Sequence, residues 1–408
     1  MKKCNELIFL FISSFLFSLI GCGSTTDNEV PGEKISVTLS MTIDKIDSHE
    51  VTSTIEVKAA GTGDLSVQDK GICYSQGVVT PTVSDEKSVY SGSGKNDFSS
   101  FKMKLEGLSE NTSYYIRPYL KVGDKEYYGY AQQVKTLGAG KEYHPLDKDE
   151  AITDYDGYQL AWSDEFNIDG KPSNEWSYET GFVRNEELQW YQEKNASVSN
   201  VVNPNYQAGS EDWKTNRNVA EYTSSSLTTQ HSHVFKYGRF EVRAKLPSAE
   251  GSWPAIWTLG NTWDWPMNGE IDIMECYLVN GKRNILANAC WSSPQQWVAV
   301  WNRSTTLLTH FIDRDADWMN KYHVWRMDWD ASKICIYLDG ELLNEINSSE
   351  TQNQGWNGNT ENPFSNDIDG FGHYILLNLA IGGNGGDPSN SLFPMRYEVD
   401  YVRVYQKK

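Results

Sequence analysis

The stretch 269–275, Gly-Glu-Ile-Asp-Ile-Met-Glu, constrains the fold of this chain more than any other part of its sequence. Large apolar residues alternate with Glu270 and Asp272, which is the period of a β-strand. On an ideal strand these two carboxylates share a face, but Glu275 lies an odd number of positions further on and points to the opposite face. A helix would spread all three carboxylates around its cylinder. We therefore expect a strand with an irregularity before Glu275.

A β-bulge is the irregularity that would correct this mismatch. One extra residue inserted near 273–274 would return Glu275 to the face that carries Glu270 and Asp272. Four strand steps would then separate Glu270 from Glu275, roughly 13 Å between their Cα atoms. Two glutamate side chains that lean together could close this to about 5–5.5 Å, the carboxylate separation of a retaining glycosidase. Acidic residues on an ordinary half-exposed strand are the alternative.

The N-terminus has the pattern of a targeting segment. A pair of lysines precedes an apolar run over 7–20 that is too short for a membrane-spanning helix. The run ends in Leu-Ile-Gly-Cys at Cys22, which resembles a bacterial lipobox. That resemblance implies a signal peptide over 1–21, lipidation of Cys22 and anchoring at the bacterial outer membrane or cell surface. A plain secretory signal is the alternative, and the polar residues 22–34 are typical of a flexible tether.

Charge and cysteine content exclude other classes of protein. The 408 residues carry a formal net charge of −19, which argues against a nucleic-acid partner. Beyond Cys4 and Cys22, the cysteines fit no metal-ligand spacing, so we expect no transition-metal site. Cys276 and Cys290 could pair across strands, but we expect free thiols and no disulfide. The residues that we expect to be buried free thiols are Cys73, Cys276, Cys290 and Cys335. We also expect a monomer.

The segment 35–137 has the pattern of an all-β module. Short alternating runs are separated by turn residues, as in a β-sandwich of about 100 residues. Pro118, inside a Thr- and Tyr-rich run, indicates an edge strand or a bulge. The pattern over 108–119 resembles the penultimate strand of fibronectin type III-like modules. We expect a spacer, with glycan binding by exposed tyrosines as the alternative, followed by a linker over 138–154.

The remaining residues, 155–408, show strand patterns and no long helical periodicity. Residues 239–246 alternate cleanly, 339–340 is an Asp-Gly hairpin signal, and 374–381 is apolar on both faces, as in a central strand. Many strands and few helices over about 250 residues predict a two-sheet, concanavalin-like jelly roll, so the whole chain is all-β. All fifteen tryptophans lie at or beyond Trp162, a density that suggests stacking on sugar rings as well as core packing.

Several motifs of this region occur together in one enzyme family. They are Trp-Pro-Ala-Ile-Trp at 253–257, the carboxylate stretch at 269–275, Tyr-Gly-Arg-Phe-Glu at 237–241, Asn-Leu-Ala-Ile-Gly-Gly at 378–383 and Val-Asp-Tyr-Val-Arg-Val-Tyr at 399–405. With this combination, the region from about 158 to 408 resembles glycoside hydrolase family 16, in particular its laminarinase-like β-glucanases.

The resemblance implies a role for each carboxylate. Glu270 matches the nucleophile, Glu275 the general acid/base and Asp272 the residue between them. A retaining mechanism needs one carboxylate ionised and one protonated. The like charges of Asp272 and Glu270 would raise the pKa of one of them and could let the pair share a proton. This chemistry requires no cofactor.

The resemblance also implies contacts to substrate and metal. The positions that match sugar contacts are Asn185, Arg239, Trp253, Trp257 and Trp265. Arg239 could instead pair with Glu241, and Trp257 could be a core residue. Glu165 and Asp400 match side chains of a structural calcium site, for which hard oxygen ligands are suited.

One segment departs from the family pattern. Relatives follow the match to 193–198 with a glycine and an apolar strand, whereas here 199–202 runs straight into a polar stretch over 203–210. A lost strand leaves backbone groups of its neighbours unpaired and uncovers apolar surface. We expect 199–202 to act as a shortened strand, with a compromised fold as the alternative. A calcium ligand of relatives lies in this segment, which counts against the metal.

Together these patterns predict an extracytoplasmic, endo-acting, retaining β-glucanase that hydrolyses β-1,3- or mixed-linkage β-1,3/1,4-glucan. Two alternatives stay open. One is a surface glycan-binding lipoprotein on a degenerate hydrolase scaffold, and the other is a family relative that acts on marine galactans.

Overall fold

The computed structural model describes residues 35–61, 66–139, 141, 143, 152–185, 187–198 and 220–408. The predicted signal peptide and tether, the lipidation of Cys22 and the shortened strand over 199–202 lie outside these residues. Within the described ranges, no helix has the length and apolarity needed to cross a bilayer.

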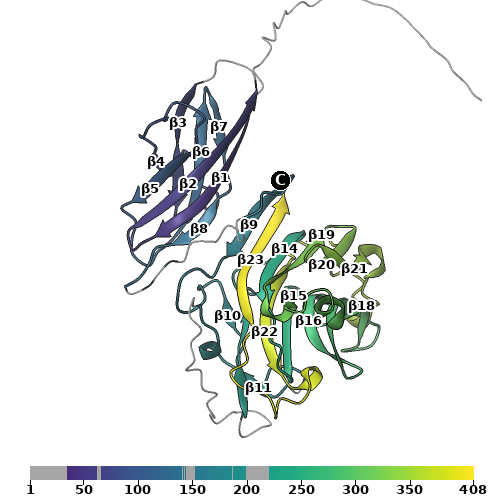
Figure 1. Ribbon diagram of the computed structural model, residues 1–408. Coiled ribbons are helices and arrows are strands. Elements are labelled where there is room, and N and C mark those ends of the chain that lie inside the picture. Colours follow the sequence, from purple (N-terminus) through teal and green to yellow (C-terminus); the bar gives the residue numbers. More distant parts are fainter. Residues whose placement is uncertain are drawn as a thin grey trace, which may run out of the picture.

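The N-terminal part consists of two antiparallel sheets that pack face to face (Figure 1). One sheet has the order β1-β2-β5, and the other has the order β4-β3-β6-β7 with β8 also paired to β6. The strands are β1 (Ile35–Ile46), β2 (Glu50–Gly61), β3 (Val67–Ser75), β4 (Glu86–Val89), β5 (Phe101–Glu106), β6 (Ser113–Val122), β7 (Lys125–Tyr128) and β8 (Gln132–Lys135). Their shared core includes Val51 and Ile55 from the first sheet and Ile72 and Ile116 from the second. The likeness of this part to fibronectin type III modules stays a prediction.

The position predicted from Pro118 is wrong. Strand β6 lies inside its sheet rather than at an edge, and its register with β3 is regular at Pro118. On the other side of β6, β8 pairs with 113–116 and β7 pairs with 119–122. Pro118 falls between these two partners, where its carbonyl accepts a hydrogen bond from Gly129 and no strand requires the missing N–H.

The C-terminal part is a sandwich of two larger antiparallel sheets (Figure 1). The seven-stranded sheet has the order β10-β13-β22-β15-β16-β17-β18, and the six-stranded sheet has the order β21-β20-β19-β14-β23-β9. The strands of the former are β10 (Ser177–Tyr178), β13 (Ser226–Thr228), β15 (Ser252–Gly260), β16 (Glu270–Val279), β17 (Lys282–Ser292), β18 (Ala299–Leu307) and β22 (His373–Ile381). Those of the latter are β9 (Tyr158–Asp164), β14 (Gly238–Lys245), β19 (His323–Trp329), β20 (Lys333–Leu338), β21 (Glu341–Asn347) and β23 (Glu398–Lys407). The all-β prediction is confirmed.

Short elements complete this part. Strands β11 (Gln189–Tyr191) and β12 (Tyr222–Ser224) form a parallel pair. The helices are α1 (Thr309–Ile312) and the single 3₁₀ turns η2 (Glu193–Asn195), η3 (Trp318–Asn320), η4 (Ser348–Glu350), η5 (Trp356–Gly358) and η6 (Gly383–Gly385). The hairpin predicted at Asp339-Gly340 joins β20 to β21, and both turn residues have positive φ, as a type I′ turn requires.

The hydrophobic core of the C-terminal part lies between its two sheets. Strands of the seven-stranded sheet contribute Ile256 and Ile271, and strands of the six-stranded sheet contribute Phe240 and Val402. The tryptophans that pack in this core are Trp162, Trp176, Trp291, Trp318, Trp325 and Trp329. Much of the tryptophan density is therefore packing. The four cysteines predicted to be free are free and buried.

A cavity of about 460 Å³ lies beside both ends of the segment 199–219. Its lining includes Val198 before that segment, Leu227 after it, and Tyr397 and Asp400 from the end of the chain. The shortened strand itself falls outside the described residues and stays a prediction.

Candidate active site

Strand β16 lies between β15 and β17 in the seven-stranded sheet, and its register is broken once. Asp272 lies opposite Asn288 of β17, but Glu275 lies opposite Leu286. Three steps along β16 therefore match two steps along β17, and the pairing with β15 shifts at the same place. One extra residue is accommodated at 273–274, so the predicted β-bulge is confirmed.

The bulge brings the three carboxylates onto one face. Ile271 and Ile273 point into the core, and Glu270, Asp272 and Glu275 occupy the opposite face of the seven-stranded sheet, which we call the carboxylate face. Asp272 is 2% exposed, and both glutamates are half-buried. The sequence alone left two arrangements open, an ordinary half-exposed strand and a carboxylate cluster. The structure shows the cluster.

Each glutamate is held by the indole of a tryptophan. Trp265 Nε1 donates to Glu270 Oε2 at 2.8 Å. Trp253 Nε1 donates to Glu275 Oε1 at 2.9 Å. A charge-assisted hydrogen bond from a rigid ring fixes the direction in which a carboxylate presents its second oxygen. The two predicted sugar contacts therefore orient the carboxylates, and direct contact with a sugar stays a prediction for both.

The Asn288 side chain links Asp272 to Glu275. Its Nδ2 donates to Asp272 Oδ2 at 3.2 Å and to Glu275 Oε2 at 3.3 Å. Sequence reasoning missed this residue. Its signal is a lone amide in the otherwise apolar run 285–291, at a position that a strand directs toward the face opposite the core.

Burial raises the pKa of all three carboxyl groups. Desolvation and then the negative charge of Glu270 raise the pKa of Glu275 to about 7. Burial and the charges of both glutamates raise the pKa of Asp272 well above its usual range. The pKa of Glu270 is also raised by burial, but the hydrogen bonds from Trp265 and Asp272 and the positive charge of Arg184 oppose that rise. The interactions that favour an ionised carboxylate are therefore strongest at Glu270, and the negative charge of Glu270 in turn favours a protonated Glu275.

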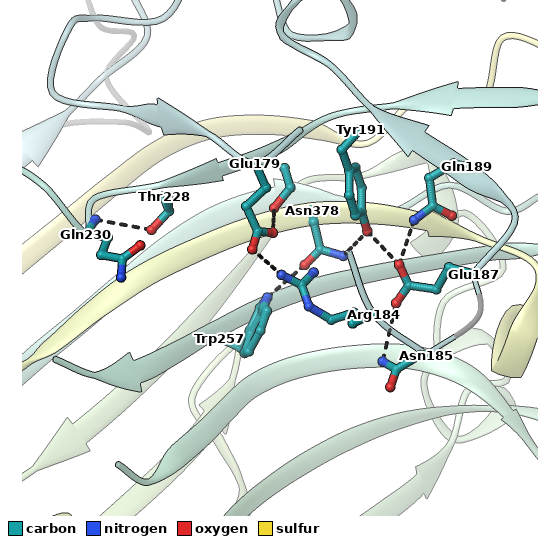
Figure 2. Close-up of polar contacts among 11 residues, drawn as sticks. Glu179, Arg184, Asn185, Glu187, Gln189, Tyr191, Thr228, Gln230, Trp257 and Asn378 are labelled. Carbon is teal, nitrogen blue, oxygen red and sulfur yellow. Dashed lines mark hydrogen bonds and ion pairs between the residues drawn. The ribbon is translucent and has the colours of Figure 1, made fainter. Parts of the chain in front are cut away.

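The other residues predicted to contact sugar on this face lie beside Arg184 (Figure 2). Trp257 Nε1 donates to Asn378 Oδ1 at 2.7 Å, and the Arg184 guanidinium carbon lies 4.9 Å from the Trp257 ring centroid. Asn185 Nδ2 donates to Glu187 Oε1 at 3.3 Å. Their roles stay predictions. Sequence reasoning missed Arg184, although it directly precedes the Asn185 motif.

Arg239 does not join this group. It lies on β14 of the six-stranded sheet, where its Nε donates to Asp328 Oδ1 at 2.6 Å and its Nη2 donates to Oδ2 at 2.9 Å. Its guanidinium also stacks on Tyr155, 4.2 Å from the ring centroid. The prediction that Arg239 contacts sugar at this site is wrong, because the residue belongs to the other sheet and is committed to Asp328.

The two residues predicted to bind calcium are already paired. Arg403 donates to Glu165 from Nη2 at 2.7 Å and from Nε at 3.0 Å, and Arg243 Nη1 donates to Asp400 Oδ2 at 2.6 Å. Both oxygens of Glu165 and one oxygen of Asp400 thus accept from a guanidinium, whose positive charge also disfavours a calcium ion at the same place. Across the described ranges, no cluster of three or more His, Cys, Asp or Glu side chains could hold a metal ion. These residues do not fit the predicted calcium site.

Known proteins resemble the C-terminal part. Residues 192–365 match the family model "Glycosyl hydrolases family 16". The chain is 30% identical over 272 residues to "Glucan endo-1,3-beta-glucosidase A1" of Niallia circulans, a match that covers 62% of this chain and 38% of that protein. It is 32% identical over 271 residues to "Beta-glucanase" of Rhodothermus marinus, covering 61% of this chain and 85% of that protein. The chain thus spans little more than a third of the first relative and most of the second.

A solved structure resembles the same part. It comes from work on endo-acting O-glycanases that prominent members of the human gut microbiota express to initiate mucin breakdown. The two superpose with a TM-score of 0.52 at 31% identity, covering 63% of this chain and 94% of that chain. The predicted jelly-roll sandwich is confirmed.

Proposed function

Because the chain belongs to glycosyl hydrolases family 16, we propose that it is an endo-acting, retaining β-glucanase that hydrolyses β-1,3- or mixed-linkage β-1,3/1,4-glucan. The observation that carries this proposal is the pair of glutamates on one strand, each held by an indole N–H, of which Glu275 has a pKa of about 7. The names of both curated relatives support a glucan as the substrate.

The chemistry follows from the two glutamates. In the first step, ionised Glu270 attacks the anomeric carbon while Glu275 donates its proton to the glycosidic oxygen, so the leaving chain departs and a glycosyl ester of Glu270 forms. In the second step, Glu275 takes a proton from a water molecule that attacks the same carbon, and the ester bond to Glu270 breaks. Two inversions at one carbon retain its configuration.

Asp272 and Asn288 support this cycle. Burial and the charges of both glutamates raise the pKa of Asp272, which favours its protonated form, and in that form it donates to the Glu270 carboxylate and favours the ionised nucleophile. Asn288 donates to Glu275 as well as to Asp272, which favours the carboxylate that Glu275 becomes after it has given up its proton. The three carboxyl groups therefore act as one coupled unit.

The proposed place of action is outside the cytoplasm, with the enzyme held as a monomer on a bacterial surface through a lipid on Cys22. Support comes from the N-terminal sequence pattern alone. The N-terminal sheets would then space the catalytic part from the membrane. Incorporation of a radiolabelled fatty acid in wild type and its loss in Cys22→Ala would test the anchor; equal labelling of both would exclude it.

The enzymatic proposal is tested by the release of reducing ends. We expect release from laminarin or lichenan, early products of intermediate length, retention of the anomeric configuration by NMR, and loss of all release in Glu270→Gln. Binding to the polymer without release would instead favour the glycan-binding lipoprotein. Release only from agarose would favour the galactan alternative, and release only from mucin would favour the substrate of the solved relative.

A further inference from the structure

Arg184 lies on the carboxylate face, in the loop between β10 and β11 (Figure 2). Its Nη2 forms an ion pair with Glu179, which also accepts a hydrogen bond from Ser226 Oγ at 2.6 Å. Its guanidinium lies over Trp257, which is opposite Asp272 on the neighbouring strand β16, and its positive charge opposes the burial that raises the pKa of Glu270. Arg184 is thus a fixed cation beside the proposed nucleophile.

The ring of Trp257 supports Arg184 and is itself immobilised. A chain of hydrogen bonds holds it: Trp257 donates to Asn378 at 2.7 Å, Asn378 Nδ2 donates to Tyr191 Oη at 3.0 Å, and Tyr191 donates to Glu187 Oε2 at 3.1 Å (Figure 2). Each donor in this buried chain has a partner, which makes the arrangement rigid. Trp257 is only 7% exposed, whereas the Arg184 side chain is 22% exposed. Of the two side chains, that of Arg184 is therefore the more accessible to a ligand.

One donor of Arg184 is left over. Its Nη1 is buried and has no hydrogen-bond partner among the described residues. A buried donor without a partner is unfavourable, and a ligand that supplies an acceptor removes that cost. The remaining nitrogen therefore suits an oxygen atom of a bound substrate.

The charges around Arg184 decide which oxygen this can be. Glu179 pairs with the guanidinium, and Glu187 and Glu270 also interact with its charge. Three carboxylates around one cation would repel a sulfate or carboxylate substituent, even though an arginine alone would attract it. A hydroxyl oxygen has no such penalty.

We propose that Arg184 is a specificity-determining residue that donates from Nη1 to a hydroxyl of a neutral sugar bound beside Glu270, and that its carboxylate partners reject acidic glycans. This inference rests on the proposed function in taking a β-glucan as the ligand. It assigns Trp257, predicted from sequence to contact sugar, the role of a support for Arg184.

Binding in a Glu270→Gln background tests the assignment without turnover. Calorimetry with a β-1,3-gluco-oligosaccharide should show affinity reduced by about tenfold to a hundredfold in Arg184→Ala, the usual effect of losing a hydrogen bond from a charged donor. Arg239→Ala is the matched control, since Arg239 also pairs with a carboxylate and stacks on an aromatic ring, but on the other sheet. Equal affinities in the two variants would overturn the proposal.

Two further measurements separate recognition from a merely structural role. In the protein that keeps Glu270, Arg184→Ala should move the acid limb of the kcat/KM profile to higher pH, because the pKa of Glu270 rises. Arg184→Lys should restore the position of that limb but not the affinity for the oligosaccharide. Glu179→Gln should narrow the preference for neutral over sulfated oligosaccharides. An unmoved acid limb, or a wild type that prefers the sulfated ligand, would overturn the proposal.

The outcome also distinguishes this inference from the proposed function. Arg184-dependent binding of the oligosaccharide by a wild type that releases no reducing ends would refute the enzyme and leave the Arg184 assignment standing. If the wild type releases reducing ends but Arg184→Ala binds the oligosaccharide as well as Arg239→Ala does, the proposed function stands and the Arg184 assignment is refuted.

Discussion

The two large sheets of the C-terminal part use charged side chains in opposite ways. On the six-stranded sheet, carboxylates are matched to arginines, as in the pairs of Arg239 with Asp328 and of Arg403 with Glu165. On the seven-stranded sheet, Glu270, Asp272 and Glu275 lie together, and within the part of the chain that the structure describes none of them forms an ion pair. Both sets lie on faces turned away from the common core.

The difference separates stability from reactivity. A paired carboxylate holds its sheet in place, whereas burial and neighbouring negative charges raise the pKa of Asp272 and Glu275 in the cluster. Burial, and then the negative charge of Glu270, raise the pKa of Glu275 to about 7. Substitutions on one sheet should therefore change the pH dependence of catalysis, and substitutions on the other should change the free energy of unfolding.

The largest effect is expected from Glu275→Gln. Loss of the proposed general acid should lower kcat/KM by about 10²–10⁴-fold. In the wild type, activity should fall as pH rises through about 7, because Glu275 then loses the proton that it must donate. That alkaline limb should be absent from the residual activity of the variant. A limb that persists would assign it to another group, and the exposed Glu345→Gln serves as the control.

Glu165→Gln tests the same comparison on the six-stranded sheet. The Arg403 side chain is only 1% exposed, so Glu165→Gln takes the carboxylate that accepts its hydrogen bonds away from a buried guanidinium, and the free energy of unfolding should fall by about 3–5 kcal/mol. Denaturant titration measures this loss, and the pH profile of the folded enzyme should not move. The matched control is Glu345→Gln at the exposed pair with Lys333, which should cost less than about 1 kcal/mol. Equal losses of unfolding free energy in Glu165→Gln and Glu345→Gln would contradict a structural role for the pair of Arg403 and Glu165.

A smaller effect is expected from Trp253→Phe. The indole N–H stabilises ionised Glu275 and so lowers its pKa. Without it the pKa rises, and the alkaline limb should move to higher pH by about one unit or less. The exposed Trp297→Phe should leave the limb in place. A shift to lower pH in Trp253→Phe would mean that the hydrogen bond favours the protonated form.

The smallest effect is expected from removal of metal. Because Arg403 and Arg243 occupy Glu165 and Asp400, a chelator should leave Tm and activity unchanged. Differential scanning fluorimetry with and without added calcium measures this. A rise in Tm of several degrees with calcium would show that the ion binds elsewhere in the chain.

Much of the site could be predicted because short-range periodicity governs it. The phase of the apolar residues in β16 required an extra residue before Glu275, and the pairing with Asn288 and Leu286 shows it. The same reasoning placed the hairpin at Asp339-Gly340. Both features depend only on neighbours in the chain and on strand geometry.

The same reasoning could not predict which strands and side chains meet over long distances in the sequence. The sequence pattern of β14 puts Arg239 on an outward face but does not say which sheet contains that strand, and its partner Asp328 lies 89 residues away. Pro118 misled because β6 has two partners on one side, with the proline between them. The contacts around Arg184 join its loop to Trp257 of β15, Asn378 of β22 and Tyr191 of β11, so only the assembled sheet could show them.

Because of the bulge at 273–274, the face on which Glu275 lies depends on the number of residues in β16. Loss of a single residue there would change the phase of every position that follows, turning Glu275 into the core and Cys276 out toward substrate. Met274 is fully buried, and conservative replacements of its side chain should be tolerated far better than its deletion. Libraries built on this scaffold should therefore vary residue identity along the strand and hold its number of residues constant.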